Sequence, residues 1–96
     1  MIVGVCRVTL RLPENGSLKG KRQVVRSLMQ RLRNKFNVAV AEVDGHDRWQ
    51  IATIGVSCVS NDARHAREVL DRVVGFIEKT RLDAELLESE VEISAF

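Results

Sequence analysis

The sequence has few of the residues that mark several common classes of protein. Its two cysteines, Cys6 and Cys58, are too few and too far apart for a disulfide framework or a zinc site. We expect both to be small buried thiols, with a bridge between neighbouring strands as the alternative. No apolar run approaches the ~20 residues of a membrane-spanning helix. The N-terminus has arginine at positions 7 and 11 and no cleavage signature, so we expect a cytoplasmic protein without a signal peptide.

Aromatic side chains are also scarce, which excludes one common mode of RNA recognition. There is no tyrosine, and the aromatic residues are Phe36, Trp49, Phe76 and Phe96. An RNA-recognition motif stacks bases on aromatic residues of its central strands. The central strands expected here have mainly aliphatic and hydroxyl side chains on their open face. We therefore expect any contact with nucleic acid to involve its backbone or shape.

Acidic residues are absent from one long stretch of the chain. No aspartate or glutamate occurs between Asn15 and Ala41. Residues 1–41 hold nine basic residues and one acid, for a charge of +8, whereas residues 42–96 hold six basic residues and twelve acids, for −6. This separation of charge is more informative about possible binding partners than the net charge of +2.

Residues 17–37 predict a helix with two neighbouring stripes. Ser17 is a good N-cap, and Asn37 ends the helix. The apolar stripe, which predicts the packed side, contains Leu18, Val25, Leu28, Met29, Leu32 and Phe36. The basic stripe contains Lys19, Arg22, Arg26 and Arg33, whereas Lys21, Arg31 and Lys35 lie elsewhere around the helix.

The rest of the chain predicts four strands and a second helix. The strands are expected at residues 2–12, 38–43 and 49–59 and in a last segment where Leu87, Val91 and Ile93 alternate with Glu88, Glu90 and Glu92. Ser60–Asp62 caps the second helix, and turns fall at Pro13–Gly16 and Asp44–Asp47. Arg7 and Arg11 are expected to face the acids of the last strand, so we do not expect those acids to be catalytic.

The order βαββαβ favours one α+β architecture. Two amphipathic helices and four half-buried strands fit a ferredoxin-like two-layer sandwich with both helices on one face. Its antiparallel sheet has the strand order 4-1-3-2, and we expect residues 1–96 to form a single domain.

The start of the first helix is a candidate anion site. A helix N-terminus has free N–H groups and a positive dipole end, so the cations Lys19, Lys21 and Arg22 are unfavourable there unless an anion binds. Phosphate, an RNA backbone or an acidic protein surface would suit, and the alternative is a solvated basic helix end. The segment is not a P-loop, because Arg22 follows Gly20-Lys21 and Asn15 stands where that motif needs glycine.

The basic stripe is a second candidate site, because a ridge of cations without interleaved acids attracts phosphates. The alternative is an ordinary solvated helix face. Together the two candidates predict anion or nucleic-acid binding by Lys19, Lys21, Arg22, Arg26 and Arg33.

The turn around Asp44, His46 and Asp47, with Glu42 before it, is a third candidate. Carboxylates and histidine could hold a metal ion or act as acid and base. Aspartate and glycine are common in turns for backbone reasons alone, and we favour that interpretation. The sequence predicts no catalytic residue, metal or cofactor, and it favours a non-enzymatic protein. Trp49 is expected to cover the end of the core rather than to stack on a ligand.

Several short segments resemble the YlxP-like family of small bacterial proteins of uncharacterised function, and the match runs across nearly the whole chain. They are Ser17-Leu18-Lys19 with Lys21-Arg22, Phe36-Asn37-Val38, Ala41-Glu42-Val43-Asp44, Trp49-Gln50 and Val59-Ser60-Asn61-Asp62. The resemblance implies a ferredoxin-like fold. Family genes tend to neighbour those for translation initiation and ribosome maturation, which implies a role around RNA or the ribosome. The family has no established catalytic residues.

Three hypotheses follow for the function. The first is a cytoplasmic protein that binds RNA or a ribosomal surface through the basic helix face. The second is a homodimeric interaction module that binds no nucleic acid and uses Val3, Val5 and Ile51 on the open sheet face, or an exposed edge strand. The third is an enzyme or metal protein acting at the Asp44–Asp47 turn.

Overall fold

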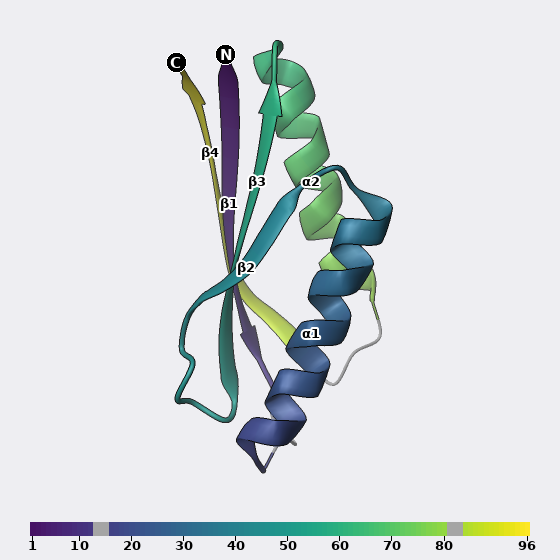
Figure 1. Ribbon diagram of the computed structural model, residues 1–96, viewed down its shortest axis with the longest axis vertical. Coiled ribbons are helices and arrows are strands. Elements are labelled where there is room, and N and C mark those ends of the chain that lie inside the picture. Colours follow the sequence, from purple (N-terminus) through teal and green to yellow (C-terminus); the bar gives the residue numbers. More distant parts are fainter. Residues whose placement is uncertain (13–15, 81–83) are drawn as a thin grey trace.

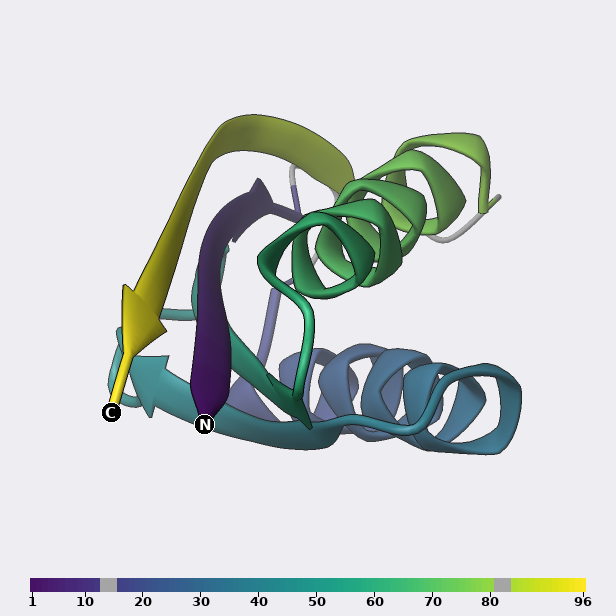
Figure 2. The same cartoon turned by 90° about the horizontal axis from the view of Figure 1, so that it is seen from above.

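The computed structural model describes residues 1–12, 16–80 and 84–96. Its elements, in order, are β1 (Ile2–Arg11), α1 (Leu18–Lys35), β2 (Ala39–Asp44), β3 (Ile51–Ser60), α2 (Ala63–Lys79) and β4 (Glu85–Ala95). The strands form one antiparallel sheet in the order β2-β3-β1-β4, and both helices lie on the same face of it (Figures 1 and 2). This is the predicted ferredoxin-like arrangement, with the same strand order read from the other edge.

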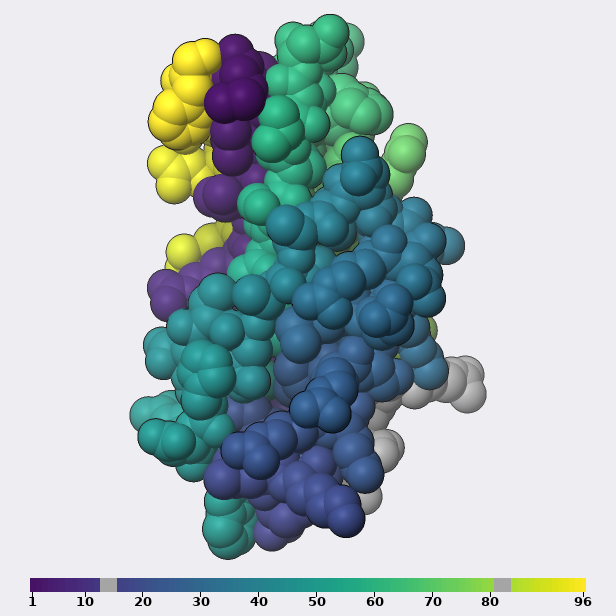
Figure 3. All heavy atoms as spheres, viewed as in Figure 1, coloured from purple at the N-terminus to yellow at the C-terminus, as the bar shows by residue number. Residues whose placement is uncertain are grey.

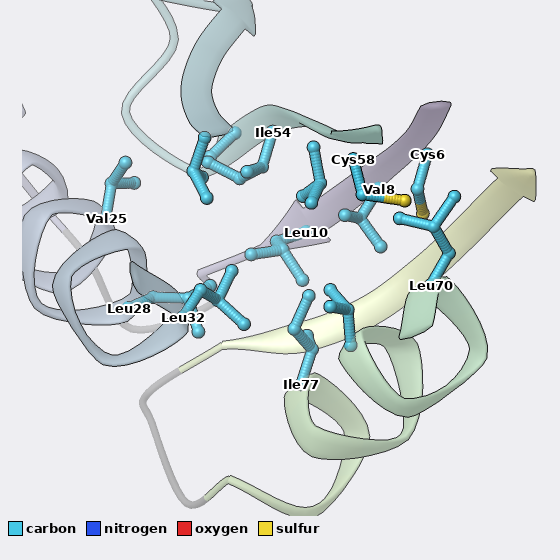
Figure 4. Packing of buried hydrophobic residues seen from close by; sticks show 14 of the residues in the cluster. Cys6, Val8, Leu10, Val25, Leu28, Leu32, Ile54, Cys58, Leu70 and Ile77 are labelled. Atoms are coloured by element: carbon cyan, nitrogen blue, oxygen red, sulfur yellow. The ribbon is translucent and has the colours of Figure 1, made fainter. Parts of the chain in front are cut away.

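The core lies between the helices and one face of the sheet. Alternate residues of the two central strands point into it, so Val8 and Leu10 of β1 and Ile54 of β3 are at most 2% exposed. Figure 4 shows Leu28 and Leu32 of α1 pointing toward this face. The second helix contributes Ala66, Leu70, Val73 and Ile77. Apolar stripes at helical spacing therefore pack where the sequence predicts.

Both helices begin at the predicted caps. The hydroxyl oxygen of Ser17 accepts a hydrogen bond from the backbone N–H of Gly20 at 3.0 Å. The carboxylate of Asp62 accepts one from the N–H of Arg64 at 2.9 Å. Each cap satisfies one of the N–H groups that a helix start leaves without a partner inside the helix.

The two ends of the sheet carry different features. The chain termini lie together at one end, where Met1 and Phe96 exchange backbone hydrogen bonds of 2.7 and 2.8 Å (Figure 1). The β2–β3 turn and the start of α1 lie at the other end, as the topology predicts. The predicted turn at Pro13–Gly16 and the connection before β4 fall partly outside the described residues, which omit 13–15 and 81–83.

The beginning of β4 differs from the prediction. The register against β1 shifts between Thr9, which faces Glu88, and Leu10, which faces Leu86, so β4 contains one extra residue there. A β-bulge of this kind reverses the alternation of side chains. Leu86 consequently packs against the core, whereas Leu87 is 48% exposed. The expectation that Leu87 shares the inward face of Val91 and Ile93 is wrong for this reason.

A charged side chain, Lys21, occupies the packed side of α1. It is 1% exposed, and its ammonium lies 3.0 Å from Glu42 Oε2 and donates a hydrogen bond to the carbonyl of Gly45. Glu42 lies on β2, on the same inward side as the buried Val40. Its Oε2 is also buried and accepts no well-oriented hydrogen bond within the described residues, so the contact is an ion pair by distance. This pair attaches the first turn of α1 to the β2–β3 turn.

Both cysteines are buried free thiols, as predicted. They lie on adjacent strands, β1 and β3, and both side chains belong to the core (Figure 4). Burial raises the pKa of the Cys6 thiol from 9.0 to about 11, and the negative charge of Asp71 adds to the effect. A thiol held in its protonated form is a poor nucleophile.

The Lys21–Glu42 pair gives a test of stability. A Glu42→Leu substitution leaves the buried ammonium without a counter-charge, so we expect the free energy of unfolding to fall by about 3–5 kcal/mol. The double variant Lys21→Met/Glu42→Leu should recover most of this loss, because replacing both charges with apolar groups is often neutral. Urea unfolding followed by circular dichroism measures both effects.

The exposed ion pair between Arg11 and Glu85, at 3.1 Å, provides the matched control. Both of its side chains are about half exposed, so Glu85→Gln should cost less than about 1 kcal/mol. Equal losses for Glu42→Leu and Glu85→Gln, or no recovery in the double variant, would contradict the role given to Lys21.

The raised pKa of Cys6 gives a second test, made in a Cys58→Ala variant with one remaining thiol. Labelling of folded protein with a thiol reagent at about pH 8 should be far slower than labelling in urea. The free energy of unfolding should be highest below pH 9, where the thiol is protonated in both the folded and the unfolded protein. It should decrease as the pH rises toward about 11, because the thiol then ionises in the unfolded protein first. Rapid labelling of folded protein at neutral pH would contradict this environment for Cys6.

Candidate nucleic-acid interface

Three cations of α1, Lys19, Arg22 and Arg26, form what we call the α1 basic surface. All three are exposed. Within the described residues, none of them has an ion pair or a side-chain hydrogen bond. Their spacing places them on one side of the helix, next to the apolar stripe that packs on the sheet. Their charge is therefore not neutralised by carboxylates of the described residues.

Arg33 continues this side of α1 toward its C-terminus. Its side chain is exposed as a whole, but Nη2 donates a hydrogen bond of 2.9 Å to the carbonyl of Val40. Because β2 is an edge strand, this bond places the basic side of α1 beside the free edge of the sheet. In Figure 3, α1 (blue) and the β2–β3 segment (teal) cover much of the near face of the molecule. The guanidinium keeps its charge, since its partner is a neutral carbonyl.

Lys21 does not belong to the α1 basic surface, so the prediction from the sequence that it binds an anion is wrong. Its ammonium is buried and contacts Glu42 and the Gly45 carbonyl. A signal for this was present in the sequence, because position 21 stands at the 4-3-4 spacing of the buried positions 21, 25, 28 and 32. A lysine in such a stripe needs a buried acid, and Glu42 supplies it.

The start of α1 keeps the positive character that the sequence predicts. The first turn contains no acidic residue, and the Ser17 hydroxyl accepts a hydrogen bond from the N–H group of Gly20. Lys19 and Arg22 remain exposed there. An anion at this end would gain from the helix dipole and from both cations.

The turn between β2 and β3 is held by its own hydrogen bonds. Asp44 Oδ1 accepts from the N–H of Gly45 at 2.8 Å, and the N–H of Arg48 donates to the Gly45 carbonyl at 3.0 Å. His46 Nε2 lies 3.2 Å from the backbone oxygen of Glu42. Gly45 has a φ of +76°, a conformation that other residues rarely adopt. These contacts give Asp44 and Gly45 a backbone role, as in other turns.

The other turn residues are not gathered into a site. No group of three His, Cys, Asp or Glu side chains that could hold a metal ion occurs in residues 1–12, 16–80 and 84–96. Trp49 is 54% exposed, so the expectation that it covers the end of the core is wrong.

One groove was missed by the sequence analysis. It has a volume of about 610 Å³ and lies where the C-terminal halves of α1 and α2 meet. The rings of Phe36 and Phe76 meet edge to face with centroids 5.9 Å apart, and Lys35 Nζ lies 5.4 Å from the Phe76 centroid. Gly75 opens the groove, since a Cβ there would meet nothing within 4 Å. The mid-helix glycine was the sequence signal for this opening.

Comparison with known proteins identifies the family but not an activity. A family model described as "Protein of unknown function (DUF503)" matches residues 3–91. "Uncharacterized protein YlxP" of Bacillus subtilis (strain 168) is 34% identical over 77 residues, which cover 80% of this chain and 84% of that protein.

A solved structure supports the fold alone. The "De novo designed protein Foldit4" has a TM-score of 0.54 and 14% sequence identity, with coverage of 100% of this chain and 99% of that one. No helix in the described part of the chain has the length and apolar character needed to cross a membrane. By the family model and by its similarity to YlxP, the chain belongs to the DUF503 family of proteins of unknown function.

Proposed function

We propose that this is a cytoplasmic, non-enzymatic protein that binds RNA or a ribosomal surface through the α1 basic surface. The observation that carries the proposal is the exposure of Lys19, Arg22 and Arg26 side by side with no carboxylate partner in the described part of the chain. Solvated helix faces usually intersperse acids with bases, and α1 contains no acid at all.

The geometry suits a nucleic-acid backbone better than bases. Residues 19–33 extend over roughly 21 Å at 1.5 Å per residue, which is long enough to follow several phosphates. Arginine and lysine bind phosphate oxygens without reading sequence. The exposed aromatic residues, Trp49 and Phe96, lie outside this surface, so it offers no base-stacking platform. We therefore expect binding that follows charge and shape and weakens strongly with salt.

Charge reversal tests the proposal. The triple variant Lys19→Glu/Arg22→Glu/Arg26→Glu should abolish binding to ribosomal subunits or structured RNA in a filter-binding assay. Single changes to glutamine should each lower the slope of log affinity against log salt by about 1, because each removes roughly one phosphate contact.

Two controls separate this surface from general charge. Arg64→Glu/Arg67→Glu changes exposed cations at the start of α2 and should leave most of the affinity intact. Lys21→Met removes a buried cation and should leave the salt slope unchanged in the folded protein. Indifference of binding to the triple reversal, or equal effects of the α2 reversal, would overturn the proposal.

A homodimer that covers the open sheet face is the second candidate. Val5, Val43 and Val59 are 43%, 49% and 69% exposed, and all three lie on the face that no helix covers. Val43 folds over Gly55, where an added Cβ would lie 2.9 Å from its Cγ1. Val3 and Ile51, named from the sequence, are already partly covered. An apolar patch of this kind is a common subunit contact.

The dimer hypothesis predicts that charges placed in the contact will convert the dimer into a monomer. Light scattering at tens of micromolar should give twice the chain mass for the unmodified protein, and Val5→Lys/Val43→Lys should give the monomer mass because it places two charges in the contact. Leu87→Lys, at an exposed apolar position on the β4 edge strand, serves as the matched control and should leave the dimer intact. A strict monomer in the unmodified protein would remove this candidate.

A further inference from the structure

The groove between the C-terminal halves of α1 and α2 has features that the proposed function does not use. We call it the aromatic groove. Its half-buried floor contains Phe36, Gly75 and Phe76, and its exposed rim contains Lys35, Arg72 and Lys79. A volume of about 610 Å³ is within the usual range of binding sites, and most of the lining is apolar. The aromatic groove is therefore large enough to receive side chains of another molecule.

The floor is an aromatic surface shared by two elements. Phe36 is the C-cap of α1 and Phe76 lies on α2, and their rings meet edge to face with centroids 5.9 Å apart. Both side chains pack against the core but remain partly exposed. Aromatic residues are enriched at the centres of protein interfaces. The exposed sides of these two rings form an apolar surface that a partner would cover.

Gly75 lies beside this surface without a reason inside the chain. After proline, glycine is the least favourable residue in a helix interior, and Gly75 lies within α2. Its φ is not positive, and a Cβ there would meet nothing within 4 Å. Neither the backbone conformation nor the packing of the described residues therefore requires a glycine. Its effect is a notch next to Phe76, which has room for a side chain of a partner.

The rim carries an excess of positive charge. Lys35, Arg72 and Lys79 form no ion pair within the described part of the chain, although Asp71 also lines the groove. Lys35 lies over the ring of Phe76, with Nζ 5.4 Å from the centroid. Three cations and one acid give the described lining a charge of +2. A partner of complementary charge is therefore acidic.

The order of these features along α2 fits a second helix. Arg72 and Lys79 are seven positions apart, which is about 10.5 Å at 1.5 Å per residue. The notch at Gly75 and the ring of Phe76 lie between them. A helix with acids at positions i and i+7 and apolar residues at i+3 and i+4 has the same order over the same length. A small molecule with one carboxylate would reach only one of the two cations.

We propose that the aromatic groove binds an acidic amphipathic helix of a partner protein. The apolar side chains of this helix enter the notch at Gly75 and cover Phe36 and Phe76, as amphipathic helices do in other apolar grooves. Its two acids pair with Arg72 and Lys79. The inference goes beyond the proposed function and does not depend on it, because the groove lies at the C-terminal end of α1 and the α1 basic surface lies in its N-terminal half.

A synthetic helical peptide is the probe. It has glutamate at i and i+7 and leucine at i+3 and i+4 in a background of alanine and glutamine. One control peptide has glutamine in place of both glutamates, and a second has alanine in place of both leucines. The amide resonances of Gly75 and Phe76 in ¹⁵N-labelled protein should shift on titration with the probe. Each control peptide should bind at least roughly tenfold more weakly, because it lacks either the ion pairs or the apolar contact.

Substitution of the rim tests the ion pairs from the side of the protein. Arg72→Gln/Lys79→Gln should weaken binding of the probe at least roughly tenfold, because it removes two charge-assisted contacts. The matched control is Arg64→Gln/Arg67→Gln, which removes two exposed cations of α2 outside the groove. The control should change the affinity by less than about threefold, since salt screens distant charges.

Substitution of Gly75 tests the notch without unfolding the protein. Gly75→Glu fills the notch and places an acid among the cations, so it should abolish binding of the probe. It should also raise the midpoint of urea unfolding, because glutamate is a better helix former than glycine and space is available at this position. Loss of binding together with a raised midpoint would support the proposal.

Four results would overturn the proposal. Shifts at Arg22 and Arg26 in place of Gly75 would show that the probe binds the α1 basic surface. Binding of phenylacetate as tight as that of the probe would identify a small carboxylate as the occupant. Shifts at Gly75 that grow with protein concentration alone would identify a second copy of the chain. Equal effects of the rim variant and its control on α2 would show that only general charge attracts the probe.

Discussion

Burial on one side of the sheet is the constraint on which the rest of the structure depends. Alternate residues of β1 and β3, such as Val8 and Ile54, are completely enclosed because two helices cover that face. The residues between them must then point to the opposite side, where no helix lies. Most polar side chains of the strands therefore lie on the open face of the sheet, and most cations of the helices lie on the outer surface of the helix layer, with Glu42 and Lys21 as the exceptions.

A buried ion pair also fixes the position of α1 against the sheet. The helix lies beside the edge strand β2, and its packed side includes Lys21, whose ammonium contacts Glu42 and the carbonyl of Gly45. Such a pair contributes little net stability compared with apolar residues, but it leaves a strong penalty for any arrangement that separates the charges. The turn between β2 and β3 is thereby fixed against the start of the helix that carries the α1 basic surface.

The fold could be predicted from the sequence because its determinants are local. Ser17 and Asp62 cap helices through neighbouring N–H groups, and periodicity alone separates helices from strands. Leu87 could not be placed, because a bulge is a property of two paired strands and leaves no trace in the alternation of one.

The candidate sites were less accessible to sequence reasoning, because they depend on contacts between distant segments. Arg7 pairs with Asp44 across an intervening strand, and only the register shows that the residue between them is Gly55. Lys21 was an intermediate case, since its spacing was visible but its acid partner lies 21 positions away.

The α1 basic surface and the acids Glu88, Glu90 and Glu92 on the open face of the sheet retain opposite potentials because they are kept apart. The molecule is about 19–22 Å across its two shorter axes, and the two features lie on opposite layers. At physiological salt the Debye length is ~8 Å, so charges on one layer are largely screened from charges on the other. A net charge of +2 therefore describes neither surface. A polyanion on α1 would leave the open face of the sheet free, whereas a dimer formed over Val5 and Val43 would cover the neighbourhood of Arg7 and Asp44. The two candidate functions therefore use different layers of the molecule and are compatible with each other.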